Sequence, residues 1–249
     1  MKKVLSYLII LFTLVTHIAA QDLRIVYIGN SITKGALLKD PTTEAPPVQA
    51  SRYIEHQTNK KVIFRNCGVS GMTTLNFLPI SNQQFPNVLK ATDELKHDKG
   101  KLIFSISLGT NDSACNTAMG APVLPESYYT NMKAIIDELL NIYPESTVII
   151  QCPLWYSPNT YNSAMYLHAG LERLKSYYPM IEKLVEHYQS VRPQQVYLGD
   201  TQAFDFFKKH HMKYFTPEKG NAGIFYLHPN KEGAKILGRF WAEAIMKAL

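Results

Sequence analysis

The sequence contains few of the residues that build metal sites and disulfide frameworks. It has only three cysteines, Cys67, Cys115 and Cys152, and none forms a CxxC pair or lies at a zinc-like spacing from histidine. We therefore expect no metal ion and no other cofactor. In an oxidising compartment Cys115 and Cys152 could form a disulfide, because both follow neighbouring predicted strands. Three free, buried thiols are the other arrangement that the sequence allows.

Charge is also sparse. Charged residues make up 18% of the chain, and the net charge is +6. The basic residues occur in separate pairs such as Lys60 with Lys61, and no basic stripe alternates with aromatic residues. This pattern is typical of a solvated surface, so we do not expect nucleic acid as a partner.

Long apolar runs are missing except at the start of the chain. Lys2 and Lys3 precede an apolar stretch over residues 4–18, which is followed by two small residues, Ala19 and Ala20. This order is typical of a signal peptide, and the stretch is short for a membrane-spanning helix. We therefore expect cleavage after Ala20, no stable membrane anchor and a secreted or periplasmic protein formed by residues 21–249.

Five short apolar runs indicate β-strands. They begin at Leu23, Lys61, Lys101, Ser146 and Gln194. Their apolar residues are mostly continuous rather than alternating, which is typical of parallel strands covered on both faces. Helical patterns follow over residues 48–58, 87–97, 125–143, 167–189 and 230–247. The alternation predicts an α/β fold, a three-layer sandwich with a five-stranded, mostly parallel sheet, whose ligand site lies at the carboxyl ends of the strands.

Three polar segments lie where such a site would form. IGNSIT presents Ser31 after the first strand, SLGTNDS places Asn111 after the third, and YLHPNKEG places His228 just before the last helix. Each segment alone has a structural interpretation, since a serine can cap a helix and Asn111 with Asp112 can form a turn.

In combination, these segments resemble the SGNH (GDSL-type) hydrolase superfamily over essentially all of residues 21–249. Ser31 matches the family's serine in a GNSI variant of the GDSL stretch, Gly68 in NCGVSG matches the second-block glycine, Asn111 the asparagine and His228 the histidine. The resemblance implies one SGNH hydrolase domain with a flavodoxin-like sheet and serine esterase activity without metal or cofactor.

The resemblance also implies a role for each matched residue. A serine hydroxyl is a weak nucleophile at neutral pH, so Ser31 needs a base, which a neutral His228 supplies. In the family the oxyanion hole consists of the backbone N–H groups at the serine and glycine positions, here Ser31 and Gly68, and of the side-chain amide at Asn111.

One position departs from the family pattern. The family usually carries an aspartate three residues before the histidine, and this chain has Phe225, which cannot accept a hydrogen bond from His228. Three explanations are open: a backbone carbonyl near Phe225 accepts that bond, a carboxylate from Glu218, Asp205 or Asp200 reaches in, or activity has been lost.

The substrate is indicated less directly. The segment from Cys152 to Tyr166 is rich in aromatic residues that suit either sugar binding or core packing: Trp155, Tyr156, Tyr161 and Tyr166. Arg52 suits either an acidic sugar or a helix surface. Family members with a secretory leader frequently deacetylate glycans, so we expect a small-molecule or polysaccharide ester, with acetyl as the acyl group. A lipase, lysophospholipase or thioesterase, and an inactive glycan-binding relative, are the alternatives.

Overall fold

A five-stranded parallel sheet forms the centre of the molecule. The computed structural model describes residues 22–249, so the expected signal peptide over residues 1–20 lies outside the described residues. The strands are β1 (Leu23–Gly29), β2 (Val62–Gly68), β3 (Lys101–Ser107), β4 (Thr147–Ile150) and β5 (Val196–Leu198). Their order is β2-β1-β3-β4-β5, and every neighbouring pair is parallel. The predicted fold class is confirmed, and β1 lies between β2 and β3.

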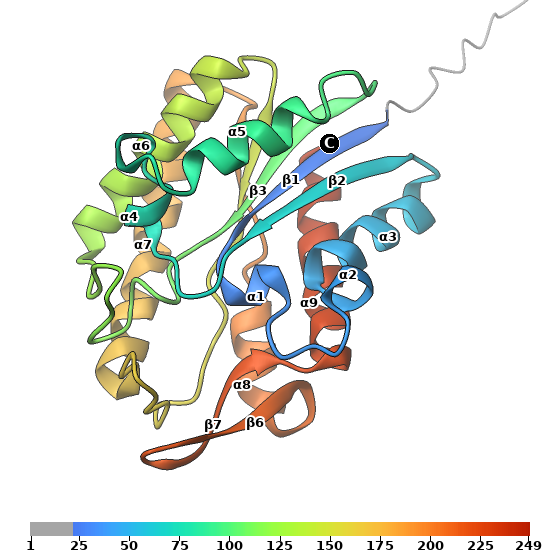
Figure 1. Ribbon diagram of the computed structural model, residues 1–249. Coiled ribbons are helices and arrows are strands. Elements are labelled where there is room, and N and C mark those ends of the chain that lie inside the picture. Colours follow the sequence, from blue (N-terminus) through green and yellow to red (C-terminus); the bar gives the residue numbers. More distant parts are fainter. Residues whose placement is uncertain (1–21) are drawn as a thin grey trace, which may run out of the picture.

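Helices cover both faces of the sheet, as Figure 1 shows. On one face lie α3 (Pro46–Thr58) and α9 (Lys231–Lys247), and on the other lie α5 (Phe85–Asp93), α6 (Pro125–Ile142) and α7 (Leu167–Val191). Short helical segments occupy the connections: α1 (Ser31–Lys34), α2 (Pro41–Glu44), α4 (Thr74–Phe77) and η1 (Pro79–Ser81). The double cover explains the continuous apolar runs, since both faces of each central strand are buried.

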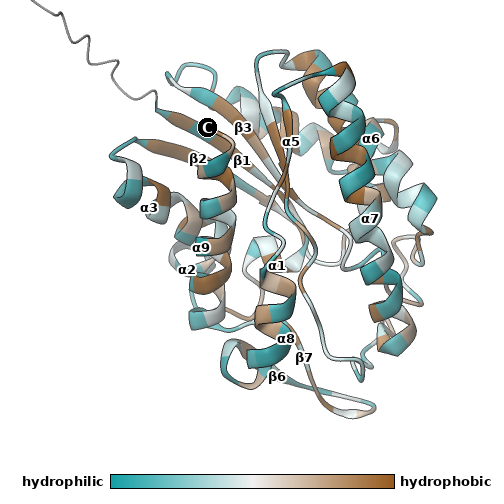
Figure 2. Ribbon diagram, turned by 180° about the vertical axis from the view of Figure 1, so that it is seen from behind, coloured by the Kyte–Doolittle hydropathy of each residue, from teal (hydrophilic) through white to brown (hydrophobic). Residues whose placement is uncertain are grey.

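The hydropathy of the elements follows this arrangement. In Figure 2 the central strands are largely brown, whereas the helices carry both apolar and polar residues. In α9, for example, Ala234, Leu237, Trp241 and Ile245 are buried at helical spacing. Within residues 22–249, no helix combines the length and the apolar character needed to cross a bilayer.

Three elements between β5 and the last helix, one helix and two strands, were not predicted. Helix α8 spans Ala203–Tyr214, and an antiparallel hairpin follows, formed by β6 (Phe215–Gly220) and β7 (Gly223–Pro229). Consequently His228 lies in a strand, and the last helix begins three residues later at Lys231. The segment FTPEKG of β6 has no apolar run, which is why its sequence does not indicate a strand.

The three cysteines are free thiols, so the disulfide between Cys115 and Cys152 that the sequence allowed is not formed. Cys67 and Cys152 are largely enclosed by protein. Burial raises the pKa of each of these two thiols to about 12, because it disfavours the charged thiolate. Both side chains are therefore packing groups and poor nucleophiles at neutral pH.

Candidate active site

Ser31 lies at the carboxyl end of the central strand. It is the first residue of α1, separated from the end of β1 by Asn30 alone, and its side chain is largely buried. The side chain of Asn30 caps the helix, because its Oδ1 accepts the backbone N–H of Ile32 at 2.9 Å. In Figure 1, α1 and the β6–β7 hairpin occupy the same end of the sheet, where the strands terminate. The fold thus brings the hairpin close to Ser31.

His228 connects Ser31 to a carboxylate. Its Nε2 lies 3.0 Å from Ser31 Oγ, and its Nδ1 lies 3.0 Å from Glu218 Oε1. Because a carboxylate accepts hydrogen bonds, Nδ1 carries the hydrogen, and Nε2 is left to accept from the serine hydroxyl. The backbone N–H of His228 donates to the same Glu218 oxygen at 3.2 Å. Both side chains are less than one fifth exposed, so solvent weakens this pair little.

Glu218 occupies the place left by the missing aspartate. In the antiparallel register of the hairpin, Glu218 of β6 is paired directly with Phe225 of β7, and directly paired residues project from the same face of a ribbon. Of the three explanations, the structure shows the second, a carboxylate from elsewhere. Asp200 instead accepts two backbone N–H groups at the start of α8, and Asp205 lies within that helix.

The amide of Asn111 is held from two sides. Its Nδ2 donates to the carbonyl of Met72 at 2.8 Å, and its Oδ1 accepts from the hydroxyl of Tyr166 at 2.5 Å. The residue is only 3% exposed. A side-chain amide has two N–H bonds, and the second has no partner among residues 22–249. One donor of Asn111 is therefore available to a ligand.

The backbone N–H of Gly68 is not free to bind an oxyanion, contrary to the sequence prediction. Its backbone N–H already donates to Asn66 Oδ1 at 2.9 Å. A Cβ atom at Gly68 would lie 2.3 Å from the backbone nitrogen of Lys34 and 2.7 Å from the carbonyl carbon of Thr33. The glycine is therefore needed where β2 packs tightly against α1, which is a structural requirement.

Gly71, three residues later, has the features expected of an oxyanion donor. Its φ is +80°, which favours glycine, and a Cβ there would meet nothing within 4 Å. It lines an open cleft together with Asn111, and its N–H has no acceptor among the described residues. The segment NCGVSG contains both glycines. The sequence therefore predicts a glycine of the oxyanion hole in this segment, but it does not show which of the two has a free N–H group.

Asp112 does more than form a turn. It is completely buried, and its Oδ1 accepts from both the backbone N–H and the hydroxyl of Thr74, at 2.9 and 2.5 Å. Burial raises the pKa of Asp112 to about 6, and these hydrogen bonds offset part of the rise. Together with Asn111, it ties the end of β3 to the segment that carries Gly71.

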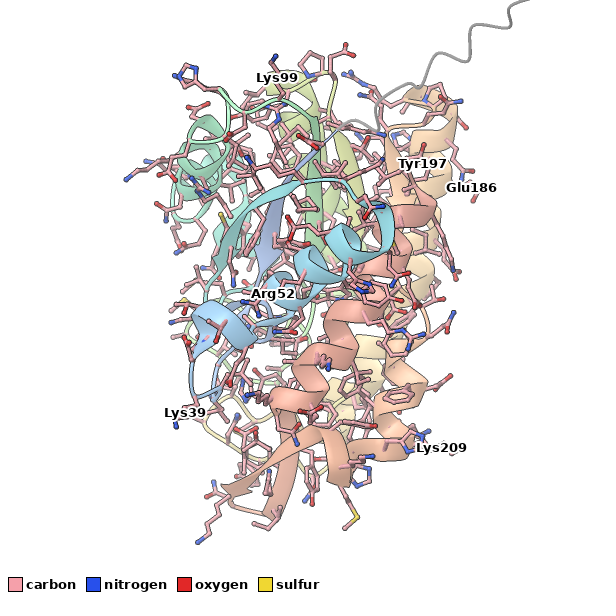
Figure 3. All side chains as sticks on the ribbon, turned by 90° about the vertical axis from the view of Figure 1, so that its right-hand side faces the viewer. Lys39, Arg52, Lys99, Glu186, Tyr197 and Lys209 are labelled. Carbon is pink, nitrogen blue, oxygen red and sulfur yellow. The ribbon has the colours of Figure 1, made fainter. Side chains whose placement is uncertain are left out.

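The cleft beside Asn111 has both polar and apolar groups in its lining. It is lined by Gly71, Asn111, Asn116, Thr117, Ala118, Met119, Ser163, Ala164 and Tyr166. Trp155, Tyr156 and Tyr166 are each at most 5% exposed, so none of them presents an open ring face to a sugar, and of the three only Tyr166 borders this cleft. Arg52, labelled in Figure 3, is a surface residue of α3 that donates to the carbonyl of Thr43. No group of three or more His, Cys, Asp or Glu side chains that could hold a metal ion occurs within residues 22–249.

Solved structures with the same fold are numerous but distant in sequence. Est24, a carbohydrate acetylesterase from Sinorhizobium meliloti, is 17% identical with a TM-score of 0.62, over 92% of this chain and 100% of that one. A lipase/acylhydrolase from Enterococcus faecalis is 18% identical with a TM-score of 0.60, over 90% and 95%. The aryl esterase of M. smegmatis is 16% identical with a TM-score of 0.60, over 91% and 99%.

No curated protein matches the chain in sequence. The family model of the GDSL-like lipase/acylhydrolase family, however, matches residues 27–236, which include Ser31, Gly71, Asn111, Glu218 and His228. This match covers most of the chain. With the Ser31–His228–Glu218 geometry and the shared fold, it shows that the protein belongs to the GDSL-like lipase/acylhydrolase family.

Proposed function

We propose that this protein is a serine esterase that removes short acyl groups, chiefly acetyl, from carbohydrate. The observation that carries the proposal is the hydrogen-bonded chain from Ser31 Oγ through His228 to Glu218, with both heavy-atom distances at 3.0 Å. This is the arrangement that converts a weakly nucleophilic hydroxyl into an attacking group.

The reaction proceeds through an acyl-enzyme. Ser31 Oγ attacks the ester carbonyl while His228 Nε2 takes its proton, and Glu218 stabilises the imidazolium through Nδ1–H. His228 then donates the proton to the departing alcohol, and a bond remains between Ser31 Oγ and the acyl carbon. Water, deprotonated by the same nitrogen, releases the acid and restores the serine.

Three donors stabilise the negative charge on the former carbonyl oxygen. They are the backbone N–H groups of Ser31 and Gly71 and the second side-chain N–H of Asn111, none of which has a partner among the described residues. Gly71 takes the place of Gly68 because the Gly68 N–H is already engaged. Losing one such donor typically lowers turnover by about 100- to 1000-fold.

Polar groups in the cleft support a hydroxyl-rich substrate. Asn116, Thr117 and Ser163 line the same cleft as Gly71 and Asn111, and they can bind sugar hydroxyls. The likeness to Est24, named as a carbohydrate acetylesterase, agrees with this substrate class. A secreted or periplasmic location, reached after removal of residues 1–20, gives access to such glycans and rests on the leader pattern alone.

The second candidate is an enzyme for longer acyl chains. The apolar groups of Ala118, Met119 and Ala164 also line the cleft, and one similar structure is named as a lipase/acylhydrolase. A series of nitrophenyl esters of increasing acyl length separates the two candidates. With an acetyl-specific enzyme the rate of hydrolysis should fall steeply as the acyl chain lengthens, whereas with a lipase the rate should rise.

The third alternative, an inactive glycan-binding relative, depended on the missing acid at Phe225. Glu218 supplies a carboxylate in hydrogen-bonding contact with His228, which removes that reason for inactivity. Glycan binding without any hydrolysis would favour this alternative over both enzymes.

Release of acetate from acetylated xylan, acetylated pectin and sialylated glycans tests the proposal. Residues 21–249 should release acetate from at least one of them, and Ser31→Ala should lower the rate at least about 1000-fold without unfolding the protein. Ser190→Ala, which removes an exposed hydroxyl on α7, serves as the matched control and should retain full activity. A folded Ser31→Ala protein with unchanged activity would exclude the mechanism.

A further inference from the structure

Tyr166 is a buried tyrosine that hydrogen-bonds to Asn111, one of the proposed oxyanion donors, and within residues 22–249 its side chain hydrogen-bonds to neither Ser31 nor His228. Its hydroxyl donates to Asn111 Oδ1 at 2.5 Å, and its side chain is almost fully enclosed. The ring of Tyr156 packs edge-on against it, with ring centroids 5.1 Å apart. The hydroxyl therefore has little freedom to turn away from Asn111.

The backbone around Tyr166 is held in an uncommon conformation. Met165 and Leu167, on either side of it, have φ of +52° and +53°, values that residues other than glycine adopt only where surrounding contacts impose them. Backbone hydrogen bonds supply those contacts: Cys115 N–H donates to the Met165 carbonyl and Leu167 N–H to the Thr160 carbonyl, both at 3.0 Å. The fold thus fixes the position of Tyr166 tightly.

Each hydrogen-bonding group of the Asn111 amide has an assigned role. Met72 takes one N–H, Tyr166 occupies the oxygen, and the second N–H is left for the substrate. Hydrogen bonds in a chain polarise one another, so donation to the amide oxygen makes the amide N–H a better donor. That gain matters most when full negative charge develops on the substrate oxygen.

We propose that Tyr166 is a positioning residue that fixes and polarises the Asn111 amide for the transition state. This inference rests on the proposed function, because it assigns Asn111 to the oxyanion hole. Tyr166 itself touches no reacting atom. Its effect should therefore appear in kcat rather than in KM, since the oxyanion exists only after substrate is bound.

The test is a double-mutant cycle between Tyr166→Phe and Asn111→Ala, measured with a short-chain nitrophenyl ester. Tyr166→Phe should lower kcat by about 10-fold and change KM by less than about twofold. In the Asn111→Ala background the same substitution should change kcat by less than about twofold, because the amide through which it acts is gone.

The matched control is Tyr156→Phe. It removes an equally buried hydroxyl, but this hydroxyl contacts Ser113 Oγ at 2.9 Å and not Asn111. Its kcat should stay within about twofold of the wild type, and its unfolding temperature reports the cost of losing a buried hydroxyl in this region. All rates are compared well below the lowest unfolding temperature of the set.

Two results would overturn the inference. One is an unchanged kcat in Tyr166→Phe, and the other is an equal loss of kcat with and without Asn111, which would make the tyrosine's effect independent of the amide. Failure of the proposed function is distinguishable from either, because then the wild type itself would be silent or Ser31→Ala would remain active.

Discussion

A single carboxylate, Glu218, holds His228 by accepting hydrogen bonds from both its ring and its backbone. Glu218→Gln keeps the size of the side chain but removes the charge that stabilises the imidazolium. We expect kcat to fall at least about 100-fold, measured with a short-chain ester. Glu186→Gln, at an exposed position of α7 visible in Figure 3, makes the same chemical change away from the site and should have no effect.

Phe225→Asp gives an independent check on Glu218. Since His228 already has a carboxylate partner, restoring the usual aspartate should not raise activity. Phe225 is also only 2% exposed, so an aspartate there should destabilise the fold. A tenfold gain in rate would show that Glu218 is not a competent partner.

Asp112 should make stability depend on pH in the mildly acidic range. Its pKa in the folded protein, about 6, is above its ordinary value of 3.8, so folding favours its protonated form. The stabilisation is complete below about pH 4 and is lost as the pH rises through about 6, by at most about 3 kcal/mol. Asp112→Asn has no such titration.

Denaturant unfolding of both proteins at about pH 3.5 and about pH 7.5, on either side of this transition, measures the effect. The unfolding free energy of the wild type should fall relative to that of Asp112→Asn between the lower and the higher pH. Other groups titrate equally in both proteins and cancel in the comparison. A constant difference between the two proteins would show that Asp112 does not titrate in this range.

The sequence alone identifies some residues of the candidate active site and misses others. Ser31 and His228 are found by their motifs, and the structure brings their side chains into hydrogen-bonding contact. Gly68 and Gly71 are three residues apart in one segment, and only φ and the space around each distinguish them. Tyr166 carries no motif, because its contact with Asn111 joins residues 55 positions apart.

At the scale of elements, the β6–β7 hairpin determines where the carboxylate lies. The hairpin is attached to the loop after β4 through three residues, of which Tyr161 accepts the backbone N–H of Asn221 at 2.9 Å. Ser157 exchanges hydrogen bonds with the backbone of Tyr226 at 2.9 and 2.8 Å, and Asn159 Nδ2 donates to the carbonyls of Ala222 and Ile224 at 3.3 and 2.7 Å. These contacts hold β7 in place, and β7 is paired with the strand that carries Glu218.

Asn159→Ala should therefore loosen the hairpin more than the rest of the fold. We expect kcat/KM to fall by about 3- to 10-fold, while the free energy of unfolding changes by less than about 1.5 kcal/mol, the usual net value of a hydrogen bond. Asn141→Ala, which removes an exposed asparagine that accepts from Arg192, is the matched control. Equal activity in both variants would mean that the hydrogen bonds of Asn159 to the hairpin are not needed to position Glu218.

The regular elements were more predictable than this hairpin. Buried parallel strands need apolar residues on both faces, so β1 and β3 appear in the sequence as continuous apolar runs. β6 instead contains Pro217, Glu218 and Lys219, and it is stabilised by pairing with β7 and by packing on one side. The acid of the site therefore lies on an element that its own sequence does not indicate.

At the scale of the whole molecule, strand order explains how distant motifs meet. β1 lies between β2 and β3, so the segments that follow these three strands, with Ser31, Gly71 and Asn111, converge at one edge of the sheet. The β6–β7 hairpin, which lies near the C-terminus in sequence, packs at the same end of the sheet and places His228 and Glu218 there. Strand order thus accounts for the meeting of Ser31, Gly71 and Asn111, and the position of the hairpin accounts for the contact between Ser31 and His228, which are 197 positions apart.

Detection of the acyl-enzyme tests the central claim most directly. The protein is mixed with nitrophenyl acetate, quenched in acid within the first turnovers, and its peptides are mapped by mass spectrometry. Addition of one acetyl group to the peptide that contains Ser31, absent in Ser31→Ala, is the predicted result. Ester hydrolysis by the wild type with no adduct on Ser31, together with undiminished turnover by Ser31→Ala, would contradict it.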